Sequence, residues 1–265
     1  MRGQFRFKDD FVYKMPVHFS GHPFYPVRVV YGDMTCISVP FETDPESIAR
    51  FVPEAFELLK PRVDVQYSNC RDVDWMAGGE YRLIQASVPV RYMGNGEGLE
   101  GDYVLVIWEN KACPIIGGRE EDGMPKLYAD IPSERHKEEH WYTGASYEGC
   151  TFLSMDFHRQ EEVELKSGAV ESHREINFLG WRYIPDLGKG GAALSQATLY
   201  PQEMDVVRMW TGEGSLNWTD LGEERHPGQF PIIRELARLP VVRWMEASMF
   251  QGSARLNVAD SRVLS

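Results

Sequence analysis

The chain has 265 residues, of which 43% are hydrophobic, and its 40 acidic side chains against 28 basic ones give a net charge of −12. This length allows one large β or α+β domain, or two small ones, with a substantial core. The acidic balance and the absence of a Lys/Arg-rich run argue against nucleic acid and anionic membranes as partners. No stretch approaches the roughly 18 apolar residues of a membrane span, and the first residues lack the apolar core of a signal peptide. We therefore expect a cytoplasmic protein that binds small molecules.

Short segments rich in β-branched and aromatic residues predict strands along most of the chain. They are residues 27–31, 82–92, 103–108, 142–147, 151–157 and 206–210, with Gly-rich turns at 94–98 and 188–191. A helix is predicted over 43–53, with Thr43 and Asp44 as alternative caps, and another over 231–238, where apolar residues recur on one face. Strands outnumber the helices and do not alternate with them regularly, which argues against a Rossmann-type array.

Several patterns that suggest other chemistry are weak. The four cysteines form no CxxC motif, so reduced thiols are expected. Two His pairs have the spacing of metal ligands on a helix, but one flanks a poor helical segment and the other lies in a highly charged run, so we predict no metal site. No GxGxxG, Walker or GxSxG motif is present, and no cofactor is expected. The residues concerned are Cys36, Cys70, Cys113, Cys150, His18, His22, His136 and His140.

Lys126 is the most informative residue of the chain. It ends the segment Gly-Gly-Arg-Glu-Glu-Asp-Gly-Met-Pro-Lys at 117–126, just after a predicted buried strand, and Met124, Pro125 and Leu127 flank it. Removal of water disfavours the charged ammonium and leaves the lone pair free to attack a carbonyl carbon. Lys126 therefore has the surroundings of a Schiff-base lysine, whereas a surface lysine after a Pro turn is the alternative interpretation.

Segments 101–108, 114–120 and 124–126, in this order, resemble the active-site region of the acetoacetate decarboxylase family. Similar landmarks at 52–54, 88–92 and 210–212 extend the resemblance over about 27–263. It implies an α+β, mostly β fold, an acetoacetate decarboxylase-like β-cone or barrel with a few peripheral helices. It also implies a single domain over 1–265, with residues 1–26 as an amino-terminal extension, and a homo-oligomer in which Lys126 forms the imine.

The resemblance assigns further positions at which this chain departs from the decarboxylases. Leu127 replaces a second lysine, so that desolvation, to which Leu127 would contribute, has to activate Lys126. Gln66 and Leu83 stand where two active-site glutamates are expected, and Glu80 replaces the second only if the strand register shifts by three residues. An arginine before the first strand corresponds to Met34, with Arg28 as a nearby alternative.

These positions give the predicted site. Lys126, Gln66 and Glu80 are predicted to be catalytic, and Arg119, Glu120, Leu83 and Met124 to bind substrate. An ion pair that merely orders the loop is an equally good interpretation of Arg119 and Glu120.

An iminium at Lys126 is an electron sink for loss of CO2 from a 3-oxo acid or for proton removal beside the imine of a 2-oxo acid. A neutral Gln66 would hydrogen-bond the substrate carboxylate and retain it, whereas an anionic glutamate would favour its loss. We therefore expect aldolase-dehydratase or hydratase chemistry on a small oxo acid, with an aldehyde as second substrate.

The alternatives are a true acetoacetate decarboxylase and a non-catalytic small-molecule-binding barrel. An unused lysine in an apolar pocket would only cost free energy, which argues against the binding barrel.

Overall fold

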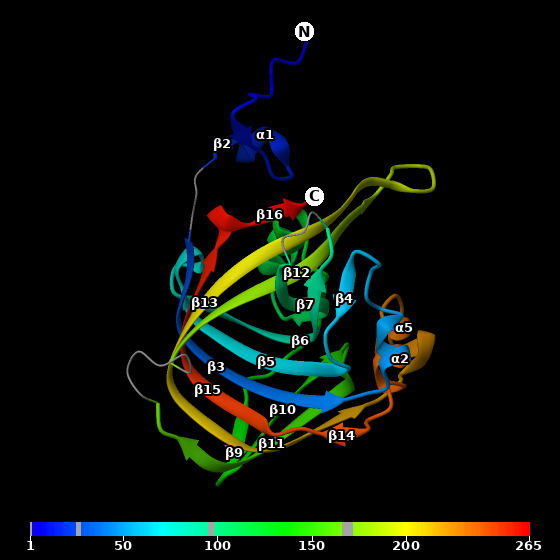
Figure 1. Cartoon of the computed structure of the whole chain (residues 1–265). Coiled ribbons are helices and arrows are strands. Elements are labelled where there is room, and N and C mark those ends of the chain that lie inside the picture. Colours follow the sequence, from blue (N-terminus) through cyan, green and yellow to red (C-terminus); the bar gives the residue numbers. More distant parts are fainter. Residues whose placement is uncertain (1, 25–27, 95–97, 166–171) are drawn as a thin grey trace.

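The fold is mostly β, as the resemblance predicts, and is built around one large sheet (Figure 1). A computed structural model describes residues 2–24, 28–94, 98–165 and 172–265. Hydrogen bonds between β12 and β13 close part of the sheet into a ring of strands. In spatial order the ring contains β12 (His173–Pro185), β7 (Glu100–Glu109), β6 (Gly79–Tyr92), β5 (Arg62–Val73), β3 (Arg28–Glu42), β15 (Ala247–Asn257) and β13 (Ala192–Trp218).

The remaining strands extend this ring or lie apart from it. The end of β13 pairs with β11, and the sheet continues through β10 and β9, while short strands pair with single ring strands. These additional strands are β11 (Cys150–Val163), β10 (His140–Tyr147), β9 (Arg135–Lys137), β4 (Phe56–Leu58) on β6, β8 (Lys126–Tyr128) on β7, β14 (Arg243–Trp244) on β3, and β16 (Arg262–Leu264) on β13. Near the amino terminus, β1 (Phe11–Val12) and β2 (His22–Pro23) form a separate two-stranded sheet beyond one end of the ring (Figure 1).

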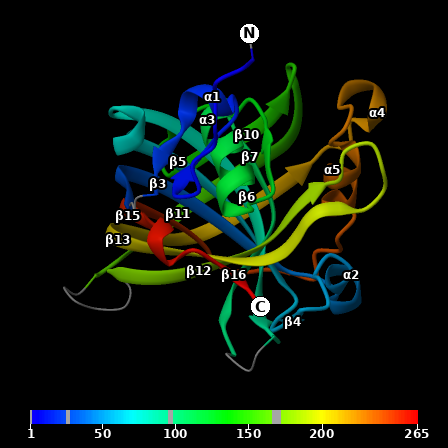
Figure 2. The same ribbon diagram turned by 90° about the horizontal axis from the view of Figure 1, so that it is seen from above.

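The helices are short and peripheral (Figures 1 and 2). They are α1 (Val17–Ser20), α2 (Pro45–Ala49), α3 (Ala112–Gly117), α4 (Gly222–Arg225) and α5 (Phe230–Ala237), with 3₁₀ turns η1 (Asp74–Met76) and η3 (Val258–Asp260) and a π-helical turn η2 (Gly118–Asp122). Asp44 caps α2, since its Oδ2 accepts a hydrogen bond from the Ser47 backbone N–H at 2.8 Å. No helix in the described ranges is long and apolar enough to cross a membrane.

Each strand predicted from sequence overlaps an observed strand, and both predicted helices are present. Three strands of the ring, β5, β12 and β15, were not among the predicted strands. The turn at 188–191 joins β12 and β13, and Gly188 and Gly191 adopt φ of +73° and +96° there. Part of the other predicted turn, residues 95–97, lies outside the described residues.

Alternation along the ring strands separates the main core from an internal cavity. On β5, Val65 and Tyr67 are fully buried in the main core, whereas Gln66 and Ser68 line the cavity. The adjacent strands repeat the pattern: Ile84, Ala86, Val106 and Trp108 belong to the core, and Leu83, Gln85, Ile107 and Glu109 line the cavity. One face of these strands therefore packs in the main core, and the other face directs polar side chains into the cavity.

Candidate active site

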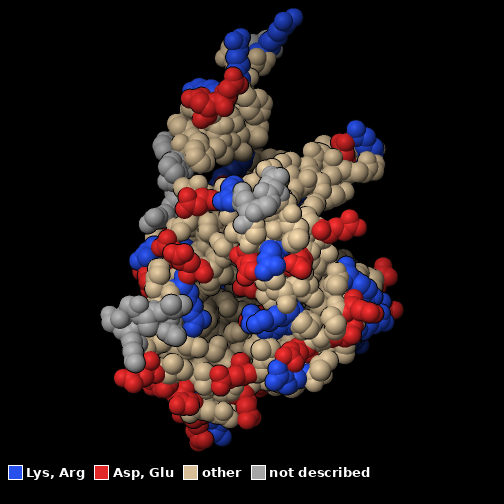
Figure 3. All heavy atoms as spheres, viewed as in Figure 1, with Lys and Arg blue, Asp and Glu red and all other residues tan. Residues whose placement is uncertain are grey.

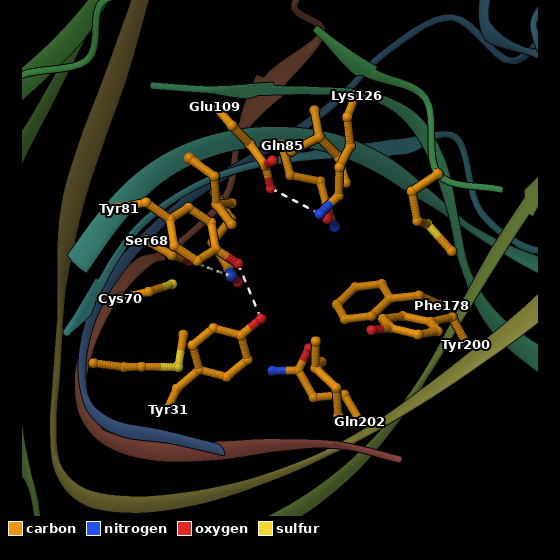
Figure 4. A pocket seen from close by; sticks show the side chains of 16 residues that line it. Tyr31, Ser68, Cys70, Tyr81, Gln85, Glu109, Lys126, Phe178, Tyr200 and Gln202 are labelled. Atoms are coloured by element: carbon orange, nitrogen blue, oxygen red, sulfur yellow. Dashed lines mark hydrogen bonds and ion pairs between the residues drawn. The ribbon is translucent and has the colours of Figure 1, made fainter. Parts of the chain in front are cut away.

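The internal cavity has a volume of about 70 Å³ and receives side chains from every strand of the ring (Figure 4). Strand register arranges part of its wall in rows: Gln66 opposes Gln85, Gln85 opposes Ile107, and Ile107 lies beside Lys126 of the parallel strand β8. The lining residues are Tyr31, Met34, Gln66, Ser68, Cys70, Tyr81, Leu83, Gln85, Ile107, Glu109, Met124, Lys126, Phe178, Tyr200, Gln202 and Leu256.

Lys126 and Glu109 form a buried ion pair in this wall (Figure 4). Lys126 Nζ lies 2.9 Å from Glu109 Oε1, and the two side chains are 13% and 0% exposed. The amine also donates a hydrogen bond to the Pro114 carbonyl oxygen at 3.2 Å. Within the described structure, Glu109 Oε2 has no hydrogen-bond partner. Burial raises the pKa of the Glu109 carboxyl, and Lys126 opposes that shift, so the carboxylate is a stronger base than an exposed glutamate.

A glycine allows the lysine side chain to occupy this position. A Cβ on Gly118 would lie 2.4 Å from both Cδ and Cε of Lys126 and 2.8 Å from Nζ. Gly118 begins the π-helical turn η2, a type of irregular turn that is common at functional sites. The main chain of η2 therefore passes directly over the amine.

The far side of β8 is held by the main core. The buried Trp108 indole N–H donates to Gln229 Oε1 at 2.8 Å, and Gln229 Nε2 donates to the Tyr128 carbonyl oxygen at 3.1 Å. Leu127 also packs against this core and does not line the cavity. The expectation that Leu127 keeps the amine dry is therefore wrong, because consecutive side chains of a strand point to opposite faces.

Two tyrosines and a cysteine supply neutral groups to the cavity. The hydroxyl oxygens of Tyr31 and Tyr81 lie 3.0 Å apart in a hydrogen bond, and burial raises the pKa of both groups well above the usual range. Both remain protonated and can donate hydrogen bonds. Burial likewise raises the pKa of the Cys70 thiol, which is therefore not a thiolate nucleophile.

A second cavity of about 260 Å³ adjoins the first, and we call the two the outer and the inner chamber. They share Tyr31, Tyr81, Lys126, Tyr200 and Leu256 as wall residues. Lys14, Glu121 and Asp122 line only the outer chamber, and Lys14 Nζ forms an ion pair with Glu121 Oε1 at 2.7 Å. The ion pair holds the segment just before α1 against η2, and in the view from above α1 overlaps α3 (Figure 2).

Asp122 has the most unusual carboxyl of the outer chamber. Burial raises its pKa to about 6, an effect that Glu121 reinforces, while Lys126, Lys14 and a hydrogen bond with Tyr200 oppose it. A carboxyl of this kind exchanges protons close to neutral pH.

The structure brings together part of the predicted site. Lys126, Gln66, Leu83 and Met124 line the inner chamber, as does Met34. The side chain of Arg28, the alternative to Met34, is outside the described ones.

Three predicted site residues lie elsewhere. Glu80 is half-exposed and forms an ion pair with Arg82. Because β6 pairs in the unshifted register, Glu80 lies on the face of the strand opposite to its neighbour Tyr81, which faces the cavity. Arg119 is exposed and donates to the Lys126 carbonyl oxygen at 3.0 Å. The main-chain oxygen of Glu120 accepts a hydrogen bond from Arg182. Neither Arg119 nor Glu120 lines either chamber or pairs with the other in the described structure, so both help to order the turn before Lys126.

Sequence reasoning missed Glu109 and Asp122. Glu109 follows Trp108 at the end of a predicted strand, and alternation from Ile107 would have placed both on one face. For Asp122, no sequence signal exists beyond its place four residues before Lys126.

Charged and metal-ligating residues elsewhere indicate no competing site. On the face in Figure 3, basic side chains are interspersed with acidic ones and form no continuous basic surface. Within the described ranges, no group of three or more His, Cys, Asp or Glu residues is arranged to hold a metal ion.

Comparison with known proteins agrees with the fold. The profile of the family described as acetoacetate decarboxylase (ADC) matches residues 14–264. Acetoacetate decarboxylase 1 of Bradyrhizobium diazoefficiens is 27% identical over 250 residues, which cover 93% of this chain and 90% of that protein. The crystal structure of acetoacetate decarboxylase from Legionella pneumophila superposes with a TM-score of 0.74 at 20% identity and covers 100% of this chain and 92% of its own.

A further structural neighbour is the enduracididine biosynthesis enzyme MppR complexed with the condensation product of pyruvate and imidazole 4-carboxaldehyde, with a TM-score of 0.68 at 15% identity and 91% of each chain covered. Because the family profile spans nearly all of the sequence, the chain belongs to the acetoacetate decarboxylase family.

Proposed function

We propose that this protein is a Schiff-base lyase that binds a small oxo acid covalently through Lys126 and performs aldolase-dehydratase or hydratase chemistry. The observation that carries the proposal is the buried pair of Lys126 Nζ and Glu109 Oε1 at 2.9 Å. A buried pair of this kind, with one carboxylate oxygen unpartnered, costs free energy and is expected at a site of chemistry.

Glu109 can handle each proton of imine formation. It takes a proton from the Lys126 ammonium, and the neutral amine attacks the carbonyl carbon. After a proton moves from nitrogen to oxygen, Glu109 returns its proton to the carbinolamine hydroxyl, which leaves as water and gives the iminium. The Glu109 carboxylate then removes a proton from the carbon beside the iminium, and an enamine forms.

The other polar groups of the inner chamber favour retention of the substrate carboxylate. Gln66, Gln85 and Gln202 present neutral amides, and within the described residues Lys126 is the only basic side chain in the wall. An amide N–H donates a hydrogen bond to a carboxylate without repelling it. The enamine can instead attack an aldehyde, and the adduct then loses water. The binding of a pyruvate–aldehyde condensation product by MppR, which has the same fold, supports this reaction.

Glu109 also favours a second candidate, decarboxylation of a 3-oxo acid. Its negative charge would oppose a substrate carboxylate held near the iminium, and that repulsion is relieved when CO2 leaves. Curated relatives with this activity in their names support the same candidate.

The decisive experiment combines borohydride trapping with two assays of turnover. Wild type incubated with pyruvate and borohydride should gain a covalent mass, Lys126→Ala should gain none, and variant Lys60→Ala, altered at an exposed lysine outside both chambers, should react like wild type. Labelling of Lys126→Ala would show that the nucleophile is another residue.

Pyruvate with an aromatic aldehyde should then give an absorbing unsaturated product, while acetoacetate should release CO2 slowly. Turnover of acetoacetate at about 1 to 10³ per second would instead establish the decarboxylase.

A further inference from the structure

We propose that the outer chamber holds the acceptor aldehyde and that Asp122 is the acid that protonates its carbonyl oxygen when the carbon–carbon bond forms. This inference rests on the proposed Schiff-base function and assigns the second substrate and a second carboxyl to it. Nothing in the sequence pattern of the site distinguished Asp122 from its neighbours.

The positions of the two chambers assign them different substrates. Lys126 lies in the wall that both share, so an enamine formed on it in the inner chamber is exposed to the outer one. The inner chamber, at about 70 Å³, suits a small donor such as pyruvate, and the outer chamber, at about 260 Å³, has room for a larger acceptor. The wall of the outer chamber combines the apolar side chains of Val29, Trp75 and Leu256 with the carboxyl of Asp122.

The carboxyls of Glu109 and Asp122 therefore lie in different chambers that both have Lys126 in their wall. Glu109 lines only the inner chamber and contacts the amine directly, whereas Asp122 lines only the outer chamber. A hydrogen bond from the Met124 backbone N–H to the Gly118 carbonyl oxygen, at 2.9 Å, holds the short turn that carries Asp122 and leads to Lys126. An acid in the outer chamber, apart from the base in the inner one, can act on the second substrate without competing for the first.

The step balances without any further reactant. The enamine carbon attacks the aldehyde carbon and forms the new bond, while the electron pair of the carbonyl π bond moves to oxygen. Asp122 gives its proton to that oxygen, and the nitrogen lone pair restores the iminium. The proton that Glu109 took when the enamine formed then passes to water, and the Asp122 carboxylate takes up one proton from water in exchange, so the number of protons is unchanged.

The charges that face Asp122 suit this role. Lys126 on β8, Lys14 on the amino-terminal segment, Glu121 in η2 and Tyr200 on β13 all interact with it, and its pKa is raised to about 6. Near neutral pH a usable fraction of the side chain carries a proton, and that fraction grows as the pH falls. Condensation should therefore become faster as the pH is lowered toward 6, provided that imine formation is not limiting.

The test separates imine formation from condensation in Asp122→Asn, which has nearly the same shape. Borohydride trapping of pyruvate and exchange of the pyruvate methyl protons for deuterium report the imine and the enamine. The rates of trapping and of deuterium exchange should stay within about threefold of wild type, while the rate of condensation with an aromatic aldehyde falls by about 10²- to 10⁴-fold. Asp130→Asn is the matched control: Asp130 lies four residues after Lys126, as Asp122 lies four before it, and lines neither chamber. It should condense at the wild-type rate.

Each contrary result has a distinct meaning. Condensation by Asp122→Asn at the wild-type rate would overturn the role of Asp122, and so would an equal loss of trapping and condensation in that variant. Trapping by wild type without condensation of any aldehyde would overturn the acceptor site and leave the imine intact. If wild type traps no oxo acid, the proposed function fails, and the role of Asp122 fails with it.

Discussion

Glu109 lies directly opposite Leu83 across the β6–β7 pair, on the cavity-facing side of both strands. Leu83 is the position at which resemblance to the decarboxylases places a glutamate. Because opposed residues of antiparallel strands have Cβ atoms only about 5 Å apart, a carboxyl on either strand reaches the same region of the cavity. The inner chamber thus contains a buried acid beside Lys126 that comes from the neighbouring strand.

We predict that moving this carboxyl back across the strand pair restores part of the function. Glu109→Leu should slow borohydride trapping of pyruvate by about 10²- to 10⁴-fold because the amine loses its proton acceptor. Adding Leu83→Glu should recover at least about a tenth of the wild-type rate. Glu109→Gln, which preserves the shape, guards against a folding defect and should be as slow as Glu109→Leu. A wild-type trapping rate in Glu109→Gln would exclude Glu109 from proton transfer.

We predict that Gly118 is required to place the Lys126 amine beside Glu109 but is not required for folding. The three atoms nearest to the Cβ in Gly118→Ala belong to the flexible end of Lys126, which can move away at little cost in stability, but the amine then leaves Glu109. Trapping should fall by about tenfold or more, with the midpoint of urea unfolding nearly unchanged.

Gly117→Ala is the matched control for this change. Its Cβ would have Glu121 Oε1, at 3.3 Å, as its nearest contact and would not touch Lys126. It should react like wild type, and a similar loss in both variants would point to a general effect on α3.

The fold class could be predicted from the sequence, and so could the place of Lys126 in a buried segment, because both depend on local order. Strand composition, the Asp44 cap and the Gly-Arg-Glu to Pro-Lys succession are readable within a few residues. Gln66 and Leu83, which the resemblance assigned, both line the cavity, and β5 and β6 pair without a shift at those positions.

The remaining site residues depend on contacts that no local pattern specifies. Glu109 reaches Lys126 through the parallel pairing of β7 with β8, and Asp122 reaches the outer chamber through a π-helical turn. Glu80 was misplaced for a related reason: the side-chain period of a strand is two, so a shift of three residues reverses the face. Arg119 and Glu120 lie in η2 outside both chambers: the Arg119 side chain donates to the Lys126 main chain, and the Glu120 main-chain oxygen accepts from Arg182.

Apolar residues of the chamber wall, and not Leu127, are predicted to exclude water from the amine. Leu127→Gln buries an amide in the main core and should destabilise the fold by about 1–3 kcal/mol without changing the pH dependence of imine formation. Leu83→Gln, in the cavity wall, should slow imine formation, because a polar side chain there admits water to the chamber. Trapping rates between pH 5 and 9 for the two variants check this, and a shift in Leu127→Gln alone would reverse the assignment.

Asp122 should also make stability depend on pH in a defined window. Its pKa is raised from 3.8 to about 6, so the folded state holds the proton more tightly than the unfolded chain does. Between these pH values the folded state binds more protons, and the free energy of unfolding therefore falls as the pH rises through the window. Above about 6 both states are ionised and the slope from this group vanishes.

Asp122→Asn lacks the titrating group, so its stability relative to wild type should rise between pH 3.8 and about 6 and then level off. Glu109 contributes equally to both proteins and cancels from the difference. Tyr200→Phe removes the hydrogen bond that stabilises the carboxylate, so its window should extend to higher pH. Urea unfolding of the three proteins from pH 4 to 8 measures these differences. Parallel curves for wild type and Asp122→Asn would mean that Asp122 is solvated like an ordinary surface carboxylate.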